Sequence, residues 1–347
     1  MLDFENLFAN PDQFLFAFDG PDAIFAPMDR EAYHRSIFMD RRLQAKDGPP
    51  TRATLEQLTA AQARAGAEPK PIGYIFHIAH CGSTLLARAL DSHDANLVCR
   101  EPMALRQLGV ARAQAFGQLP APEFQKRLNL LTTLLSRRYN AAGPVIVKAN
   151  VPVNFMIGPL MDLQPQQPAI LLHFGLEPYL LAILKAHQQW VQHISVELGA
   201  GIDAVVGAPA NGASTPVLAA RLWLAQMRLY ARALETYPNA ASLDADVLFA
   251  RPREALAAAY RHFGQPLTAG EIEAIVGGPL FNHYSKNPNR AYDNETRRAL
   301  LDAQRLELAD ALREARAWIE TQPAAAQLPR QLAKPLVGGG NELLGAA

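Results

Sequence analysis

The sequence predicts an α/β protein with a central parallel sheet and helices on both of its faces. Short, continuous apolar runs recur along the chain, as in strands that are buried on both faces. Stretches with helical spacing separate these runs, which is the alternation typical of parallel sheets. The chain has 347 residues, long enough to bury a large core without disulfides or a structural metal.

The predicted strands are short and apolar. The first, 72–79, follows two prolines and is the most continuous. The other strands are predicted at 96–99, 144–148, 169–174 and, more weakly, 241–249.

Helices are predicted where leucines and alanines recur every three or four residues. Thr51 is a candidate cap for the first helix and Asn294 for the last, long one. The predicted helices are 51–66, 83–91, 123–138, 178–189, 217–235, 253–263 and 294–320.

The two ends of the chain differ in composition from the middle. The first 50 residues mix aromatic, acidic and turn residues, so we expect an irregular N-terminal extension, residues 1–70, packed on the core. Residues 71–321 form the predicted main domain. The segment 322–347 contains three prolines and a run of three glycines, and we expect it to be poorly ordered.

Charge and cysteine content exclude several classes of protein. The 33 basic residues are balanced by 33 acidic ones, which argues against nucleic acid as a partner. No apolar run reaches the ~18 residues of a membrane span, and the acidic start does not resemble a secretory signal. Two cysteines make no disulfide framework. We therefore expect a cytoplasmic protein without a membrane partner.

The most informative segment is 74–90, where the first strand enters the turn Cys81-Gly82-Ser83-Thr84 and a helix follows. Backbone N–H groups and hydroxyls at such a turn can bind an anion. Compared with the triphosphate pattern G-x-x-x-x-G-K-[ST], the chain has His77 for the first glycine and Ser83 for the lysine. Ordinary triphosphate chemistry is therefore disfavoured, while anion binding is not. A simple turn without a ligand is the alternative.

This turn resembles the 5′-phosphosulfate loop of P-loop sulfotransferases, especially the bacterial Gly-Ser-Thr-Leu-Leu form. The resemblance implies a P-loop NTPase-like three-layer fold with helical additions at both ends. It also implies transfer of a sulfuryl group from 3′-phosphoadenosine 5′-phosphosulfate to a hydroxyl or amine, without a metal. The family usually has a basic residue where this chain has His80. The implied phosphosulfate-binding residues are His80, Cys81, Gly82, Ser83 and Thr84.

Other segments resemble the family in the expected order, over about residues 70–290. Cys99–Pro102 resembles the Glu-Pro segment after the second strand, and the strand ending at Lys148 resembles the third. Cytosolic members have a base histidine at the position of Asn150, which cannot act as one. The late strand, proline turn and helix at 241–264 also match. Lys286 lies where a late loop often contributes to the nucleotide or substrate site.

The chain departs from the family after the fourth strand. The family's Arg-Asp-Pro is Leu176-Glu177-Pro178 here, and the serine that also holds the 3′-phosphate is Leu184. Either other cations hold this phosphate, or the donor is altered, or activity is lost. The candidate cations are Lys185, Arg221 and Arg228.

Three residues are candidates for catalysis. Glu101, at the end of a core strand, is the candidate base, although it could instead pair with Arg100 or cap the next helix. Lys148 is either an anion contact or a residue that only ends its strand. His80 is a candidate donor to the phosphosulfate. His77 and His80 could suggest a metal pair, but no Cys, Asp or Glu partners have ligand spacing around them. His77 is therefore expected to be an ordinary strand residue.

Three functions follow from these features. The first is a sulfotransferase that acts on a small-molecule acceptor and uses Glu101, His80 and Lys148 for catalysis, with Lys185 and Lys286 among the donor-binding residues. The second is a nucleotide-dependent phosphotransferase on the same fold. The third is a non-catalytic, sulfotransferase-like interaction protein. A homodimer is compatible with all three, and the acceptor has no recognisable motif.

Overall fold

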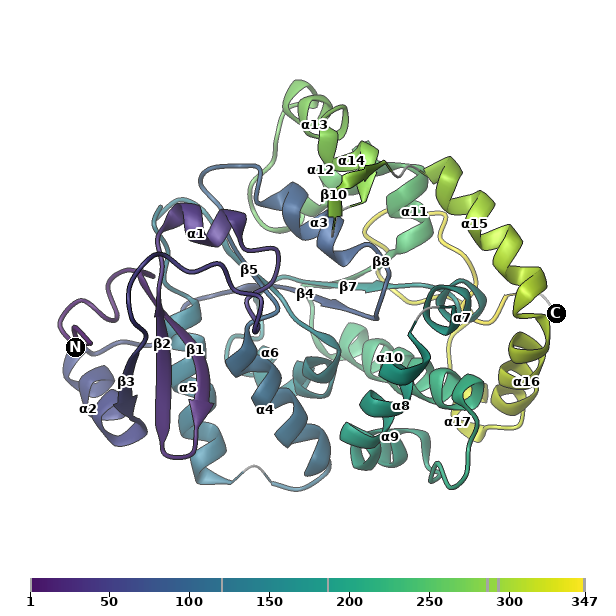
Figure 1. Ribbon diagram of the computed structural model, residues 1–347, viewed down its shortest axis with the longest axis horizontal. Coiled ribbons are helices and arrows are strands. Elements are labelled where there is room, and N and C mark those ends of the chain that lie inside the picture. The colour runs from purple at the N-terminus through teal and green to yellow at the C-terminus, as the bar shows by residue number, and fades with distance from the viewer. Residues whose placement is uncertain (1, 120, 186, 285–286, 292–293, 346–347) are drawn as a thin grey trace.

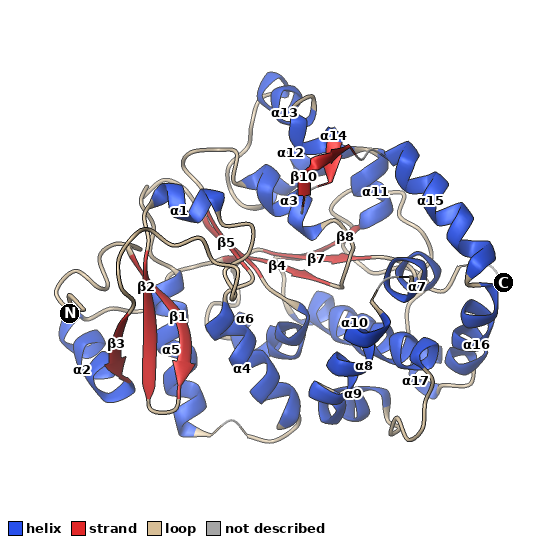
Figure 2. Ribbon diagram, in the orientation of Figure 1, coloured by secondary structure: helices blue, strands red, loops and turns tan. Residues whose placement is uncertain are grey.

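A five-stranded parallel sheet lies at the centre of the molecule, with helices on both faces (Figures 1 and 2). The computed structural model describes residues 2–119, 121–185, 187–284, 287–291 and 294–345, except for the side chains of 283–291 and 298. The predicted α/β class is confirmed. In their order across the sheet, the strands are β5 (Leu97–Arg100), β6 (Val145–Lys148), β4 (Gly73–His77), β7 (Ala169–His173) and β8 (Ala240–Asp244).

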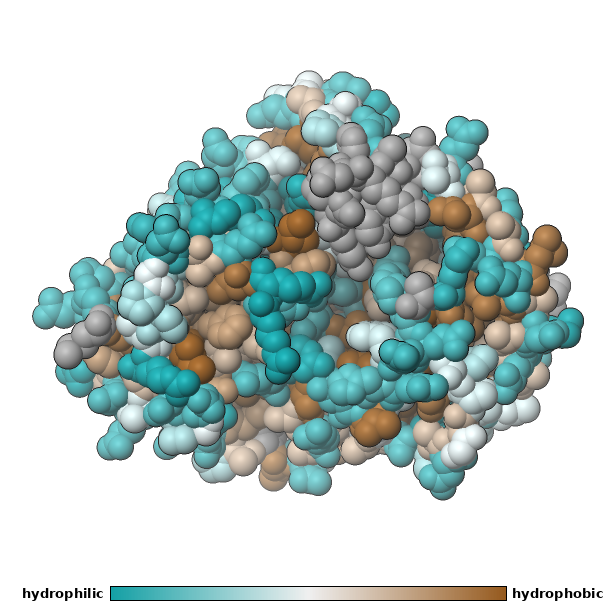
Figure 3. All heavy atoms as spheres, in the orientation of Figure 1, coloured by the Kyte–Doolittle hydropathy of each residue, from teal (hydrophilic) through white to brown (hydrophobic). Residues whose placement is uncertain are grey.

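Every residue of these five strands is buried, which explains why they are continuous apolar runs in the sequence. Because all five strands are parallel, their carboxyl ends meet at one edge of the sheet. Hydrophilic side chains cover most of the face in Figure 3, and the apolar ones there form small groups. Most of the large apolar side chains therefore lie in the buried core.

The helices alternate with the strands, mostly as predicted. The helices of the main domain and the C-terminal region are α3 (Ser83–Leu90), α4 (Met103–Gln114), α5 (Pro122–Leu135), η1 (Val151–Met156), α6 (Ile157–Met161), α7 (Leu176–Leu184), α8 (Gln188–Glu197), α9 (Gly199–Val206), α10 (Thr215–Thr236), α11 (Ala245–Ala250), α12 (Pro252–His262), α13 (Ala269–Val276), α14 (Pro279–Asn282), α15 (Asn294–Glu307), α16 (Ala309–Glu320) and α17 (Pro323–Ala326). A two-stranded ribbon, β9 (His283–Tyr284) and β10 (Asn287–Ala291), lies between α14 and α15. Among the residues described, no helix combines the length and apolarity needed to cross a membrane.

Two of the predicted helices are broken. The helix expected at 178–189 is divided into α7 and α8, and His187, which precedes α8, has a φ of −133° that no helical residue adopts. The helix expected at 294–320 is divided into α15 and α16 at Leu308, whose φ of −102° interrupts the helical backbone. Helical spacing continues across both breaks, so the sequence pattern did not reveal them.

The N-terminal extension is more regular than predicted. It contains an antiparallel sheet of β1 (Gln13–Asp19), β2 (Asp22–Pro27) and β3 (Thr51–Thr54), with α1 (Arg30–Arg35) after β2 and α2 (Leu55–Ala65) after β3. The helix expected from Thr51 begins at Leu55 instead. Residues 51–54 pair with β2, and the hydroxyl of Thr54 accepts from the backbone N–H of Gln57 in a capping box.

A buried arginine fastens this extension to the sheet. Arg100, the last residue of β5, donates to the backbone oxygens of Tyr33, His34 and Ser36 and to Asp91 Oδ2 at 2.8 Å. Its own backbone oxygen accepts from the N–H of Met39 at 2.7 Å. The loop after α1 is therefore held against the carboxyl end of β5.

The C-terminal segment lies along the opposite edge of the sheet. Instead of being poorly ordered, it pairs with β8: the N–H of Leu336 donates to the oxygen of Ser242, whose own N–H donates to the oxygen of Lys334. Leu332 and Leu343 are buried, which accounts for its order. In Figure 1 this yellow segment passes behind the sheet near β8 and α11. The predicted boundaries at residues 70 and 321 remain predictions.

Candidate active site

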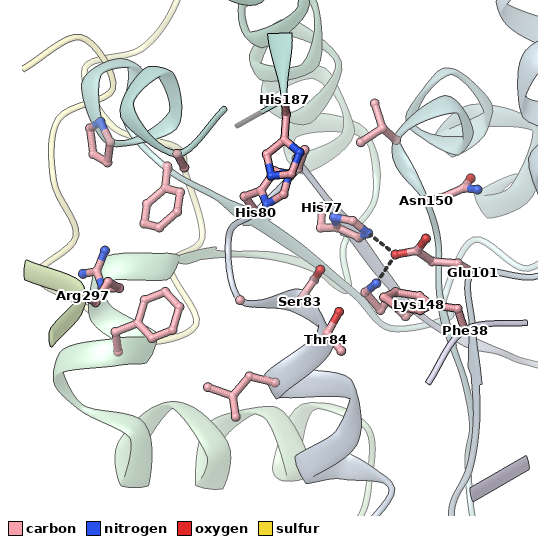
Figure 4. A pocket seen from close by; sticks show the side chains of 18 of the residues that line it. Phe38, His77, His80, Ser83, Thr84, Glu101, Lys148, Asn150, His187 and Arg297 are labelled. Atoms are coloured by element: carbon pink, nitrogen blue, oxygen red, sulfur yellow. Dashed lines mark hydrogen bonds and ion pairs between the residues drawn. The ribbon is translucent and has the colours of Figure 1, made fainter. Parts of the chain in front are cut away.

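A cavity of about 910 Å³ opens where the strands β4, β5 and β6 end. Its walls come from the turn after β4, the ends of β5 and β6, the loop at 38–42, and helices α7, α8 and α15. Figure 4 shows polar side chains of these elements converging on it. Ligands of open parallel sheets bind at this edge, outside the carboxyl ends of the strands.

The floor of the cavity is the predicted anion-binding turn. Gly82 precedes α3 with a φ of +81°, and a Cβ at this position would lie 2.7 Å from the ring of Phe249. Ser83 and Thr84 begin the helix, so their backbone N–H groups lie at its positive end. The hydroxyl of Thr84 is buried and has no hydrogen-bond partner among the described residues. Burying such a group is costly, which points to a ligand that accepts from it.

His80 is held in an unusual backbone conformation above this turn. Its φ of +63° lies in the left-handed region, which non-glycine residues rarely adopt. The imidazole stacks on that of His187, with ring centroids 4.1 Å apart and planes 21° apart. Both rings line the cavity, so His80, which stands where the resemblance leads us to expect a basic residue, is joined there by a second histidine from just before α8.

Glu101 and Lys148 form an ion pair at the other end of the cavity. Their strands are neighbours, with Arg100 in register with Lys148, and Lys148 Nζ donates to Glu101 Oε1. The lysine side chain is 1% exposed, and its Nζ lies 5.3 Å from the ring centroid of Phe38. Glu101 has a φ of +57°, a second left-handed residue in the site. The alternative that Glu101 pairs with Arg100 is wrong, because Arg100 is engaged by Asp91 and the N-terminal loop.

Most of the predicted site residues share this cavity. Cys81 does not line it: its side chain is fully buried, and its thiol donates to the oxygen of Ile78 at 2.9 Å. Lys286 lies outside the described residues. The predicted residues that line the cavity are His80, Gly82, Ser83, Thr84, Glu101, Lys148 and Lys185.

Two of the three cations suggested for a 3′-phosphate lie elsewhere. Arg221 donates to Asp203 and to the oxygen of Ala208, and Arg228 donates to Ala324 and Gln327. Neither arginine lines the cavity. The third, Lys185, lines the cavity, and its Nζ lies 3.9 Å from Oε2 of Glu307.

Sequence reasoning missed a buried arginine in the cavity wall. Arg297, in α15, donates to Asp246 Oδ1 at 2.6 Å, and its guanidinium lies 4.5 Å from the ring centroid of Phe249. The ring of Phe174 is parallel to that of Phe249, with centroids 6.4 Å apart. The spacing of apolar residues in α15 predicts a helix, but it does not show which part of the protein that helix contacts. In Figure 4, Arg297 and Glu101 lie on opposite sides of the view, with Thr84 between them.

A second arginine borders the cavity near Glu101. Arg42 makes a double hydrogen bond to the carboxylate of Asp40, and this contact raises the pKa of the guanidinium. Its Cζ lies 3.7 Å from the ring centroid of Phe38. Within the described residues, no group of three or more His, Cys, Asp or Glu side chains is arranged to hold a metal.

Solved sulfotransferases are similar to this chain. The sulfotransferase from Alicyclobacillus acidocaldarius is 11% identical, with a TM-score of 0.38 over 74% of this chain and 98% of its own. The sulfotransferase domain from the curacin biosynthetic pathway is 13% identical, with a TM-score of 0.38 over 76% and 93%. The sulfotransferase domain of the Synechococcus PCC 7002 olefin synthase is 16% identical, with a TM-score of 0.36 over 74% and 97%.

No family model and no curated protein matches the sequence.

Proposed function

We propose that this protein transfers a sulfuryl group from 3′-phosphoadenosine 5′-phosphosulfate to a hydroxyl or amine on a small molecule. The observation that carries the proposal is the placement of the Gly82–Thr84 turn and Glu101 in one cavity. The turn offers backbone and hydroxyl donors to an anion, and the unpartnered Thr84 hydroxyl is one of them. Glu101 offers a carboxylate at the adjoining end, where an acceptor would lie.

In this proposal, the phosphosulfate lies on Ser83 and Thr84, with His80 above it. The nucleoside end of the donor extends towards Arg297, Phe174 and Phe249, where aromatic faces and a guanidinium can take a planar base or a phosphate. Arg297 and Lys185 would then replace the arginine and serine that the chain lacks at Leu176 and Leu184.

The acceptor lies at the Glu101 end. Its hydroxyl or amine attacks the sulfur, the bond from sulfur to the bridging oxygen breaks, and Glu101 takes the acceptor's proton. Lys148 keeps the Glu101 carboxylate fixed. Asn150 also lines the cavity, and its buried Oδ1, which has no hydrogen-bond partner among the described residues, can accept from an acceptor N–H or O–H.

One contact favours the non-catalytic alternative. The N–H of Leu176, the first residue of α7, donates to the backbone oxygen of Leu343 in the C-terminal segment at 2.7 Å. In the family, the segment at this position holds the 3′-phosphate, so here a chain oxygen already uses one of its donors. A phosphotransferase is less favoured, because Ser83 stands where the triphosphate lysine would be.

Ligand-induced stabilisation separates the three functions. We expect adenosine 3′,5′-bisphosphate to raise the melting temperature selectively, since binding at a hundred times Kd adds about 2.7 kcal/mol. A shift with ATP or GTP alone would favour the phosphotransferase. No shift with any of the three nucleotides, together with no transfer of labelled sulfur from the donor to a mixed panel of alcohols and amines, would favour the non-catalytic protein.

Matched variants locate the binding site. Thr84→Val should abolish most of the bisphosphate shift, because it removes a buried hydroxyl donor from the turn. Ser92→Ala, in the exposed turn that follows the same helix, should leave the shift unchanged. Equal shifts in both variants would place the ligand elsewhere.

A further inference from the structure

His77 is the last residue of β4, and the sequence suggested no role for it. Its ring is buried, yet it lines the cavity. Nδ1 lies 2.8 Å from the backbone oxygen of Ile78, and Nε2 lies 3.7 Å from Glu101 Oε1 (Figure 4). The two ring nitrogens therefore have different partners: a backbone carbonyl and the candidate base.

The carbonyl contact decides which nitrogen carries the proton. A backbone oxygen can only accept, so Nδ1 must be the protonated nitrogen of the neutral ring. In the neutral ring, Nε2 then has a lone pair and faces Glu101. Buried groups hold the backbone at this point, since Asn154 Nδ2 donates to the oxygen of His77 at 3.1 Å and is itself bonded to Gln226.

Charged groups face this ring from two neighbouring strands. Glu101 follows β5, and Lys148 ends β6 and donates to the same oxygen, Oε1, that His77 approaches. From η1 and α10, the uncharged Asn154, Gln226 and Tyr230 form the buried network beneath it. Within the turn itself, His80 lies above it in Figure 4. One oxygen of Glu101 is therefore held by a lysine and lies beside a histidine, and the other can be presented to the acceptor.

We propose that His77 is the proton-accepting partner of Glu101, an inference that rests on the function proposed above. Glu101 takes the proton from the acceptor as the new bond to sulfur forms. The carboxyl group then turns about its Cγ–Cδ bond, so that the protonated oxygen replaces Oε1 beside the ring. This O–H gives its proton to Nε2 of His77, which becomes an imidazolium while Glu101 returns to a carboxylate. The adenosine bisphosphate leaves with the electrons of the broken bond, and His77 later releases the proton to water.

The pairing can be tested without turnover. In a titration of the ¹⁵N-labelled full-length protein, His77 should show the Nδ1–H tautomer when neutral, with its signal assigned from His77→Gln. Glu101→Gln should lower the pKa of His77 by at least about half a unit, because it removes the facing carboxylate. An unchanged pKa, or the opposite tautomer, would overturn the proposal even if the protein has no sulfotransferase activity.

Kinetics then separates proton transfer from a structural role. His77→Gln keeps a donor for the Ile78 oxygen but cannot accept the proton, so kcat should fall about tenfold or more while KM for the acceptor and the bisphosphate shift stay unchanged. The part of the acid limb of the pH–rate profile that comes from protonation of His77 should disappear, which leaves only the limb set by Glu101. His262→Gln, a histidine that also contacts a backbone oxygen but lies outside the cavity, is the control and should behave as wild type.

If the wild-type protein transfers sulfur and His77→Gln retains its rate and pH profile, the proposal about His77 fails while the proposed function stands. If the wild-type protein neither binds the bisphosphate nor transfers sulfur, the function fails. The titration then still decides whether His77 and Glu101 are coupled.

Discussion

The ammonium group of Lys148 lies between a carboxylate and an aromatic face: it donates to Glu101, and its Nζ is 5.3 Å from the ring centroid of Phe38. Phe38 belongs to the N-terminal extension, whereas the other two residues end strands of the central sheet. The extension is therefore part of the cavity wall, beside the candidate base.

Phe38→Leu should weaken catalysis without weakening donor binding. Leucine keeps the apolar bulk but lacks the negative ring face that attracts the ammonium, an attraction of about 0.5–2 kcal/mol. We expect turnover to fall several-fold, with the bisphosphate shift unchanged. Phe18→Leu is the matched control. The Cζ of Arg127 lies 5.1 Å from the centroid of that ring, and Phe18 does not line the cavity. Equal turnover in both variants would show that the ring of Phe38 does not contribute to catalysis.

Glu101→Gln should reduce turnover by about a hundredfold or more, since an amide cannot take the acceptor's proton. It also leaves the buried ammonium of Lys148 without its counter-charge, and breaking such a pair costs about 3–5 kcal/mol. The double variant Glu101→Gln, Lys148→Met should recover part of that stability and none of the activity. Urea unfolding of the four proteins of this cycle measures the coupling, and additive losses would contradict it.

Arg100→Met should loosen the N-terminal extension. The substitution keeps much of the buried volume but removes all of the guanidinium's hydrogen bonds, and it leaves Asp91 without its buried partner. We expect a loss of about 3–5 kcal/mol in unfolding free energy. Hydrogen exchange should increase first in residues 33–39. Arg52→Met, whose side chain makes an exposed pair with Asp19, should cost at most about 1 kcal/mol.

His262 should make the protein less stable in mild acid. Burial lowers its pKa from the usual value of 6.5, so at pH below about 6.5 the unfolded chain binds more protons than the folded one. Stability is then lost as the pH falls below that value. Burial lowers the pKa of His173 as well, so the wild-type slope has more than one source. His262→Gln should make the urea midpoint fall less steeply between pH 7 and 5, and an unchanged slope would contradict this.

Periodicity and turn residues were sufficient to place the five strands of the central sheet along the chain, although the strand predicted at 241–249 ends at Asp244 and the chain continues as helix α11. Each of its strands is buried on both faces, and a strand buried in this way has a continuous apolar run in its sequence. The N-terminal sheet was missed because its strands are short and lie between turn residues, although the turn at 19–22 between β1 and β2 was visible in the sequence.

The candidate site was only partly predictable. The turn at 82–84 and Glu101 follow predicted strands, so their position at the sheet edge could be inferred. The Glu101–Lys148 pair depends on β5 and β6 being neighbours in the sheet. The apolar pattern of a strand does not show which strand lies beside it, so this pair could not be predicted. Arg297 reaches the cavity through the packing of a distant helix, which helical spacing does not specify.

The terminal segments also determine how two copies of this chain could meet. Met39 bonds to the end of β5, and residues 334–336 bond along β8, so both outer strands of the central sheet already have a backbone partner from their own chain. Exposed strand edges are where separate molecules join into continuous sheets and aggregate. Joining through the outer edge of β8 would first require displacing residues 334–336, so a dimer of the intact protein would use another surface, such as helices, loops or the N-terminal sheet.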